Sequence, residues 1–154
     1  MKIISRFRGK YRFLSNFSES PFTFEGLRYP TVEHAYQERK TLDPKQRVVI
    51  RTSPNVVTAA RIGRSKSTIL RPDWYDIKGK IMEPLVYEKF KQNPELAKML
   101  IETGDAILIE GNYWHDNYFG LCSCVKCHEG EQPLNMLGEI LMMVRSRLRE
   151  ELHS

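Results

Sequence analysis

The chain has 154 residues, of which 41% are hydrophobic and 28% charged; this composition fits one globular domain and excludes a disordered chain. No apolar run approaches the roughly 20 residues that cross a bilayer, and the first residues lack the apolar stretch of a signal peptide, so we expect a cytoplasmic protein with no membrane partner. The net charge of +5 favours anionic partners such as phosphates or nucleic acid, although the basic residues are scattered.

The N-terminal part of the chain predicts short strands. The segments 2–7 and 22–27 have strand composition, with Glu25-Gly26 as a turn. The segment 13–17 predicts a loop in which two aromatic residues enclose a polar pair.

Helices dominate the rest of the chain. Thr31 follows Pro30 and is a favourable N-cap, so a helix is predicted from Val32 to Thr41. Capping residues and apolar periodicity predict further helices, and a compact apolar run predicts one more strand. The helices are expected at 45–51, 56–63, 76–92, 95–102 and 134–152, and the strand at 106–110. We therefore expect an α+β fold: a helix-dominated single domain over residues 1–154 with a small antiparallel sheet.

The first predicted helix carries a candidate acid–base group. Glu33, Gln37 and Lys40 share one helix face, and Tyr36 lies beside them. An ionised Glu33 could stabilise a cation or act as a base, and a protonated one could act as a general acid. The alternative is an ordinary surface helix with a Glu–Lys pair.

A second group of candidates lies at the start of the helix 76–92. Lys78 borders its apolar stripe, where a lysine often only extends its charged end to solvent. A desolvated lysine can instead lose its proton and attack a sugar aldehyde carbon. Trp74 could stack on a base or form part of the core.

The segment 112–120 mixes aromatic rings with polar side chains. Asp116 and Asn117 offer polar edges beside the rings of Trp114, Tyr118 and Phe119. Gly111 and Gly120, at either end of the segment, allow close approach to a ligand. An ordinary aromatic loop is the alternative.

A cysteine cluster follows directly. Cys122, Cys124 and Cys127, together with His128 or His115, could supply four zinc ligands. No second C-x-x-C pair is present, so reduced thiols in a loop are the favoured alternative and no metal or other cofactor is predicted.

These motifs, in this order, resemble the YbiA/NADAR family over nearly the whole chain. The ordered set is far more specific than any one motif. The residues that carry the resemblance are 13–17, 29–37, Lys40, 61–64, Asp73-Trp74, Lys78, Met82, 103–105, 110–112, 116–120 and 135–142. The family usually has Trp-Gly where this sequence has Phe119-Gly120, and a phenyl ring lacks the indole N–H donor.

The resemblance implies an N-glycosidase that splits the bond between a ribose-type sugar and a nitrogen. Some family members are linked to phosphorylated riboflavin-pathway intermediates and others to removal of ADP-ribose from guanine in DNA. The implied catalytic residues are Glu33, Lys78 and Asp116, with Lys40 competing for the role of the lysine. The implied substrate-binding residues are Asn16, Tyr36, Gln37, Lys40, Trp74, Phe119, Gly120 and Asn135.

Phosphates of such a substrate require cations, and residue type alone offers Arg8, Lys10, Arg61 and Arg64. Two other functions stay open from the sequence. One is a module that binds ADP-ribose or modified nucleic acid without turnover. The other is a small zinc-dependent nucleic-acid-binding protein built on the cysteine cluster.

Overall fold

The computed structural model describes residues 1–129 and 132–154, and the side chains of His128 and Glu129 also lie outside the described part. The chain divides into two compact units. Unit 1 contains residues 1–15 and 94–154, and unit 2 contains residues 16–93. The prediction of one domain over residues 1–154 stays a prediction.

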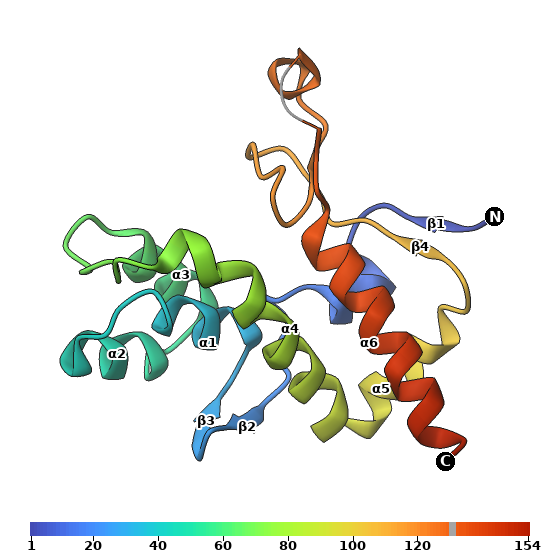
Figure 1. Ribbon diagram of the computed structural model, residues 1–154, viewed down its shortest axis with the longest axis horizontal. Coiled ribbons are helices and arrows are strands. Elements are labelled where there is room, and N and C mark those ends of the chain that lie inside the picture. Colours follow the sequence, from blue (N-terminus) through green and yellow to red (C-terminus); the bar gives the residue numbers. More distant parts are fainter. Residues whose placement is uncertain (130–131) are drawn as a thin grey trace. The chain divides into compact units, whose positions relative to one another are not determined.

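Unit 2 is a group of helices with one hairpin (Figure 1). Its elements are β2 (Phe22–Phe24), β3 (Leu27–Tyr29), α1 (Val32–Glu38), α2 (Pro44–Arg51), α3 (Val56–Arg64) and α4 (Trp74–Gln92). The two strands pair antiparallel with Phe22 opposite Tyr29, and their rings lie 5.7 Å apart. The sequence predicted one strand and a turn here; the turn at Glu25-Gly26 is confirmed, and a second strand follows it.

Unit 1 combines two helices with short strands. Its elements are β1 (Ile3–Ile4), the 3-10 helix η1 (Gly9–Leu14), α5 (Pro94–Glu102), β4 (Ile107–Leu108), β5 (Gly111–Asn112), β6 (Leu121–Cys122), the 3-10 helix η2 (Val125–Glu129) and α6 (Met136–Leu152). Strand β1 pairs parallel with β4, and β5 pairs parallel with β6. Within this unit, the segment that carries β6 and η2 extends beyond the N-terminal end of α6 (Figure 1).

The helix-dominated α+β class is confirmed, with two differences in detail. Of the three two-stranded sheets in the described residues, only β2–β3 is antiparallel. A tight hairpin turn joins only antiparallel strands, so in each parallel pair a longer segment of the chain lies between the two strands. The segment 13–17, predicted as a loop, begins with the last two residues of η1.

Side-chain caps explain where the helices of unit 2 begin. Thr31 Oγ1 accepts a hydrogen bond from the backbone N–H of His34 at 3.0 Å, as the sequence predicted. Asp43 and Asn55 cap α2 and α3 in the same way, at 2.9 and 2.8 Å. Helix α1 ends at Glu38, three residues before the predicted Thr41.

The long helices bury one stripe each. In α4 the buried residues include Met82, Leu85, Val86 and Phe90, which confirms the predicted period. In α6 the stripe runs from Leu137 to Leu148. The predicted stripe was too long at both ends, because Leu134 precedes α6 and is 53% exposed and Leu152 is 70% exposed.

Arginines of α6 bind the end of α5. Arg145 donates to Thr103 Oγ1 at 2.9 Å, and Arg149 donates to the carbonyl of Gly104. These two arginines of α6 therefore stabilise the chain at the C-terminal end of the neighbouring helix α5.

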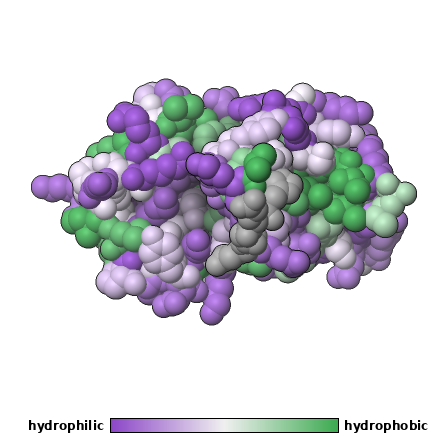
Figure 2. All heavy atoms as spheres, turned by 90° about the horizontal axis from the view of Figure 1, so that it is seen from above, coloured by the Kyte–Doolittle hydropathy of each residue, from purple (hydrophilic) through white to green (hydrophobic). Residues whose placement is uncertain are grey.

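The surface mixes residue types. Figure 2 shows one face on which hydrophilic residues lie between groups of hydrophobic ones. None of the helices in the described part of the chain combines the length and the apolar composition of a transmembrane span.

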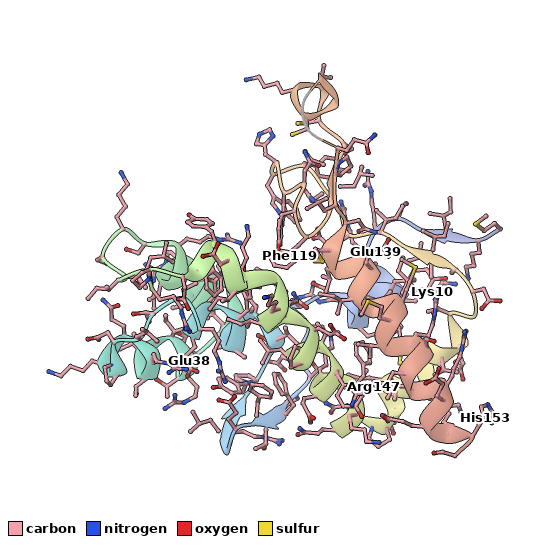
Figure 3. The ribbon with its side chains drawn as sticks, in the orientation of Figure 1. Lys10, Glu38, Phe119, Glu139, Arg147 and His153 are labelled. Atoms are coloured by element: carbon pink, nitrogen blue, oxygen red, sulfur yellow. The ribbon has the colours of Figure 1, made fainter. Side chains whose placement is uncertain are left out.

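Glu38 is the centre of a buried polar network in unit 2 (Figure 3). Its side chain is fully buried and accepts from Tyr29 Oη at 2.6 Å, Arg51 at 2.6 Å and Arg47 at 3.3 Å. Burial, followed by the bond to Glu38, raises the pKa of Tyr29 to about 12. The network ties β3, α1 and α2 together.

We expect Glu38→Ala to lower the free energy of unfolding by about 3 kcal/mol or more, because it leaves the tyrosine and two arginines without their buried acceptor. Urea denaturation measures the change. Glu83→Gln, at an exposed position of α4, is the control and should change stability by less than about 0.5 kcal/mol. Similar effects from both variants would contradict a structural role for the network.

The burial of Lys89 leads us to expect that the stability of the protein depends on pH. It is fully buried at the end of α4, where Nζ donates to Ser18 Oγ at 3.2 Å, and burial lowers its pKa from 10.5 to about 7. Between these two values the unfolded chain binds a proton that the folded chain does not. The unfolding free energy contributed by this group therefore rises with pH from about 7 towards 10.5.

Lys89→Met should accordingly be more stable than the wild type near neutral pH, and the difference should shrink as the pH rises towards 10.5. Denaturation at a series of pH values measures it. Lys80→Met, at an exposed position of α4, should follow the wild type. A pH-independent difference for Lys89→Met would mean that the lysine keeps its charge on folding.

Candidate functional site

Helix α1 is the first part of the candidate site, and all seven of its residues are buried. Its start is held from two directions. Thr31 caps it, and the backbone carbonyl of Asn16 accepts from the N–H of Glu33 at 3.1 Å. Asn16 is itself buried, with Nδ2 3.4 Å from Met82 Sδ in α4. The predicted residues Asn16 and Glu33 are therefore neighbours in space.

Glu33 pairs with Gln37 one helical turn away. Gln37 Nε2 donates to Glu33 Oε1 at 2.6 Å, and both residues are buried, with Glu33 6% exposed. The alternative of an ordinary surface helix is excluded by this burial. Gln37 Oε1 is buried without a hydrogen-bond partner among the described residues.

Gly63 allows α3 to pack closely on this pair. A Cβ atom at position 63 would lie 2.1 Å from Gln37 Oε1 and 2.8 Å from its Cβ. Any side chain there would displace Gln37 and with it the amide that holds Glu33. The resemblance included Gly63, and the structure supplies a physical reason for a glycine at this position.

Lys40 interacts with the charge of Glu33 and with two other cations. Burial lowers the pKa of Lys40, the charge of Glu33 opposes that shift, and Arg64 and Lys78 add to it. These electrostatic effects indicate that Glu33, Arg64 and Lys78 each lie close enough to Lys40 to act on its charge within unit 2. The backbone carbonyl of Lys40 accepts from Arg71 N–H at 2.7 Å, which fixes the chain just after α1.

Two aromatic rings stand between α1 and α4. Tyr36 and Trp74 meet edge to face with their centroids 5.1 Å apart, and they are 8% and 3% exposed. Trp74 therefore packs against Tyr36 in this structure, and its role as a stacking or shaping group for a ligand stays a prediction. Lys40 Nζ lies 5.8 Å from the centre of the Tyr36 ring.

Unit 2 also contains a surface cavity of about 490 Å³ along α3. It is lined by Phe17, Val57, Ala60, Arg61, Arg64 and Ser65. Arg64 belongs both to the cavity and to the cations that act on Lys40. Of the four arginines and lysines suggested for phosphate, Arg61 and Arg64 line the cavity. Arg8 and Lys10 lie in unit 1 over tyrosine rings.

The predicted residues Asp116, Phe119 and Gly120 belong to a tightly bonded loop of unit 1. Asp116 Oδ1 accepts from the N–H groups of Tyr118 at 3.0 Å and Phe119 at 2.9 Å, which is the pattern of a turn-capping aspartate. Its backbone pairs with the side chain of Asn112 at 2.8 and 3.2 Å. One carboxylate oxygen of Asp116 therefore holds the loop.

Gly120 and Asn135 also have structural partners. A Cβ atom at position 120 would lie 2.1 Å from the carbonyl oxygen of Glu110, so only glycine fits there. Asn135 accepts from Glu110 N–H at 3.0 Å and donates to the Leu108 carbonyl at 2.9 Å. Phe119 lies beside the start of α6, where its carbonyl accepts from Leu137 N–H at 3.0 Å (Figure 3). Their roles in binding substrate stay predictions.

The cysteine cluster is the one group of potential metal ligands in the described residues. Cys122, Cys124 and Cys127 lie with His115 in unit 1, all four ligand atoms within 4.8 Å of one another. Of the two histidines that the sequence offered as a fourth ligand, the structure brings His115 to the thiols. His128 lies outside the described side chains.

Sequence reasoning did not single out Glu38 or Asn112. Glu38 gave no signal beyond its type, because its partners come from β3 and α2. Asn112 was part of a recognised motif, and its bonds to the Asp116 backbone could have been anticipated from the frequent use of asparagine in turns.

Comparison with known proteins decides the family. A sequence model of the NADAR domain matches residues 5–149, which spans both units. The chain belongs to the NADAR family. This confirms the resemblance inferred from the motifs.

Similar proteins of this family carry related names. The chain is 36% identical to "N-glycosidase YbiA" of Escherichia coli over 145 residues, which is 92% of this chain and 84% of that protein. It is 34% identical to an N-glycosidase of Nostoc punctiforme over 142 residues, or 90% of this chain and 86% of that one. A riboflavin biosynthesis protein of Vibrio vulnificus is 36% identical over 142 residues, 90% of this chain but 36% of that longer protein.

The fold is shared as well. The NMR structure of Escherichia coli YbiA matches with a TM-score of 0.85 at 35% identity, covering 99% of this chain and 88% of that one.

Asp116 can be tested as a turn residue. Asp116→Asn retains Oδ1 as an acceptor for both amides and should leave stability nearly unchanged. Asp116→Ala removes the acceptor and should cost about 1–2 kcal/mol. Thermal and urea denaturation of both variants measure this. Equal destabilisation by the two changes would show that the charge, rather than the hydrogen bonds, holds the loop.

Proposed function

We propose that this NADAR protein hydrolyses the N-glycosidic bond between a phosphorylated ribose or ADP-ribose and an amine or nucleobase, in the cytoplasm. The names of its relatives support an N-glycosidase. The riboflavin biosynthesis relative supports phosphorylated ribosyl amines as one substrate class. ADP-ribosylated guanine in DNA, which the family resemblance suggested, is the other class, and the same C–N bond would be broken in both.

The observation that carries the proposal is the buried Glu33 carboxylate, which accepts a hydrogen bond from Gln37 and acts on the charge of Lys40. Arg64 and Lys78 act on the same lysine. Breaking an N-ribosidic bond develops positive charge on the sugar carbon, and a fixed carboxylate in a dry environment stabilises that charge strongly. The neighbouring cations suit the negative charge of the substrate phosphates.

The direct reaction needs two proton transfers. The C1–N bond breaks with its electron pair on the nitrogen, which takes a proton from a general acid. A water oxygen forms the new bond to C1 and gives its proton to a carboxylate. In this scheme Glu33 stabilises the sugar cation and accepts the proton from water. The lysines beside it are candidates for the acid.

A covalent route is the alternative that the lysines allow. If the sugar ring opens, a neutral lysine amine attacks C1 and forms a Schiff base as the substrate nitrogen departs as an amine. Water then releases the sugar and restores the lysine. Lys78 was the first choice from the resemblance. The lowered pKa of Lys40 favours Lys40, because burial increases its neutral fraction.

The cavity beside α3 suits the rest of such a ligand. Arg61 and Arg64 provide cations for a phosphate, and Phe17 provides a ring against which a base can pack. Its volume of about 490 Å³ is within the usual range for small-molecule sites.

The test compares two substrates on one enzyme. An ADP-ribosylated guanine oligonucleotide and an aminopyrimidine ribose phosphate are incubated with the protein, and mass spectrometry identifies the released sugar. Glu33→Gln should fold normally and reduce turnover at least about a hundredfold, the loss expected for an acid–base group. Glu83→Gln, on the exposed side of α4, is the matched control.

Borohydride added during turnover distinguishes the two routes. Reduction of a Schiff base leaves the sugar attached to Lys40 or Lys78, and absence of an adduct leaves direct water attack. Ligand binding without release of any base or amine would reduce the protein to a binding module. Wild-type turnover by Glu33→Gln would remove Glu33 from the chemistry.

A further inference from the structure

The cluster around Cys122 has the composition and spacing of a metal site. His115 Nδ1 lies 3.2 Å from Cys124 Sγ, 3.3 Å from Cys127 Sγ and 4.0 Å from Cys122 Sγ. All four ligand atoms lie within 4.8 Å of one another. The four residues belong to unit 1, in a segment that runs from the end of β5 into η2.

These distances agree with tetrahedral zinc. With Zn–S bonds of about 2.3 Å and Zn–N bonds of about 2.1 Å, a nitrogen and a sulfur lie about 3.6 Å apart and two sulfurs about 3.8 Å apart. The three observed nitrogen–sulfur distances fall on both sides of that value. Three thiolates and one imidazole are a common ligand set of structural zinc sites.

A disulfide explains the cluster less well. The three cysteines are free thiols. They could form at most one disulfide, which would leave one thiol over and give the imidazole nitrogen no role. A metal ion accounts for all four side chains at once.

The backbone around the cluster is arranged to hold these side chains. His115 has a left-handed backbone, with φ of 68°, which few residues other than glycine adopt. The parallel pairing of β5 with β6 places Asn112 opposite Cys122, and Ser123 N–H donates to the Asn112 carbonyl at 2.9 Å. The side chain of Asn117 accepts from Cys122 N–H at 2.8 Å.

One further bond is typical of metal thiolates. The N–H of Cys124 points at Cys122 Sγ at a distance of 3.5 Å. Backbone N–H groups directed at sulfur stabilise the negative charge that a metal-bound cysteine carries.

We propose that this chain binds one structural Zn²⁺ ion through His115 Nδ1 and the sulfurs of Cys122, Cys124 and Cys127. Four protein ligands close the coordination sphere, so the ion has no open position for substrate. Binding releases the thiol protons and involves no oxidation or reduction. The three thiolates and the ion together carry one negative charge.

The position of the ligands gives the ion a definite structural role. His115 immediately precedes Asp116, and Cys122 follows Gly120 by two residues. The zinc ion therefore fixes both ends of the segment 116–121, which contains Asp116, Phe119 and Gly120 of the family motif. At the start of α6, the N–H groups of Met136 and Leu137 donate to the carbonyls of Tyr118 and Phe119 in this segment, so the ion supports that contact as well.

The test begins with untagged wild-type protein, purified under reducing conditions and without chelator. Elemental analysis should find about one zinc per chain. Cobalt added to the reduced, metal-free protein should give the absorption bands of tetrahedral thiolate coordination, and zinc should displace it. Zinc should also slow the reaction of the thiols with a thiol reagent, and a chelator should restore it.

Variants assign the ligands. Cys124→Ser and His115→Ala should each weaken zinc binding at least about tenfold, and Val125→Ala, at an exposed position of the same loop, should bind as the wild type does. Circular dichroism checks that each variant is folded. Wild-type protein that neither contains zinc nor shows cobalt–thiolate bands would overturn the proposal. Equal zinc binding by Cys124→Ser and the wild type would also overturn it, because the metal would then be held elsewhere.

Discussion

The polar side chains buried along α1 are the constraint on which unit 2 depends. A helix enclosed on all sides is normally apolar. Helix α1 instead carries two carboxylates, an imidazole and an amide among its buried side chains. His34 lies between Thr31 and the carbonyl of Ser53, at 2.8 and 3.2 Å, and burial lowers the pKa of its imidazole. Such a network stabilises a fold only when its members find partners, so the surrounding elements are positioned by it.

The same helix carries Glu33, so the buried network and the proposed catalytic carboxylate share one element. Glu38 accepts from side chains of β3 and α2, whereas Glu33 accepts from Gln37 and acts on the charge of Lys40. Two carboxylates five residues apart on one helix thus have different partners, because each faces a different part of unit 2. A rigid, fully enclosed helix also holds the Glu33 carboxylate in one position, which electrostatic stabilisation of a transition state requires.

Local patterns in the sequence were enough to predict much of this arrangement. The Thr31 cap, the period of α4 and the pairing of Glu33 with Gln37 depend on residues within a few positions of each other, where helical geometry alone decides. The parallel pairing of β5 with β6, the cavity around Arg64 and the partners of Glu38 depend on residues brought together from distant parts of the chain. Two histidines were candidates for the fourth ligand beside the cysteines. The turn that brings His115 there needs a left-handed residue, which no propensity predicts.

Gly63 shows that a residue on a neighbouring helix can determine the position of a side chain in the candidate site. The backbone of α3 approaches Gln37 so closely that one added methyl group would displace that amide, and the amide holds the Glu33 carboxylate. Position 63 therefore determines how closely α3 approaches Gln37 and, through Gln37, where the Glu33 carboxylate lies. A contact between two helices therefore determines the position of a side chain in the candidate site, without any change to that side chain itself.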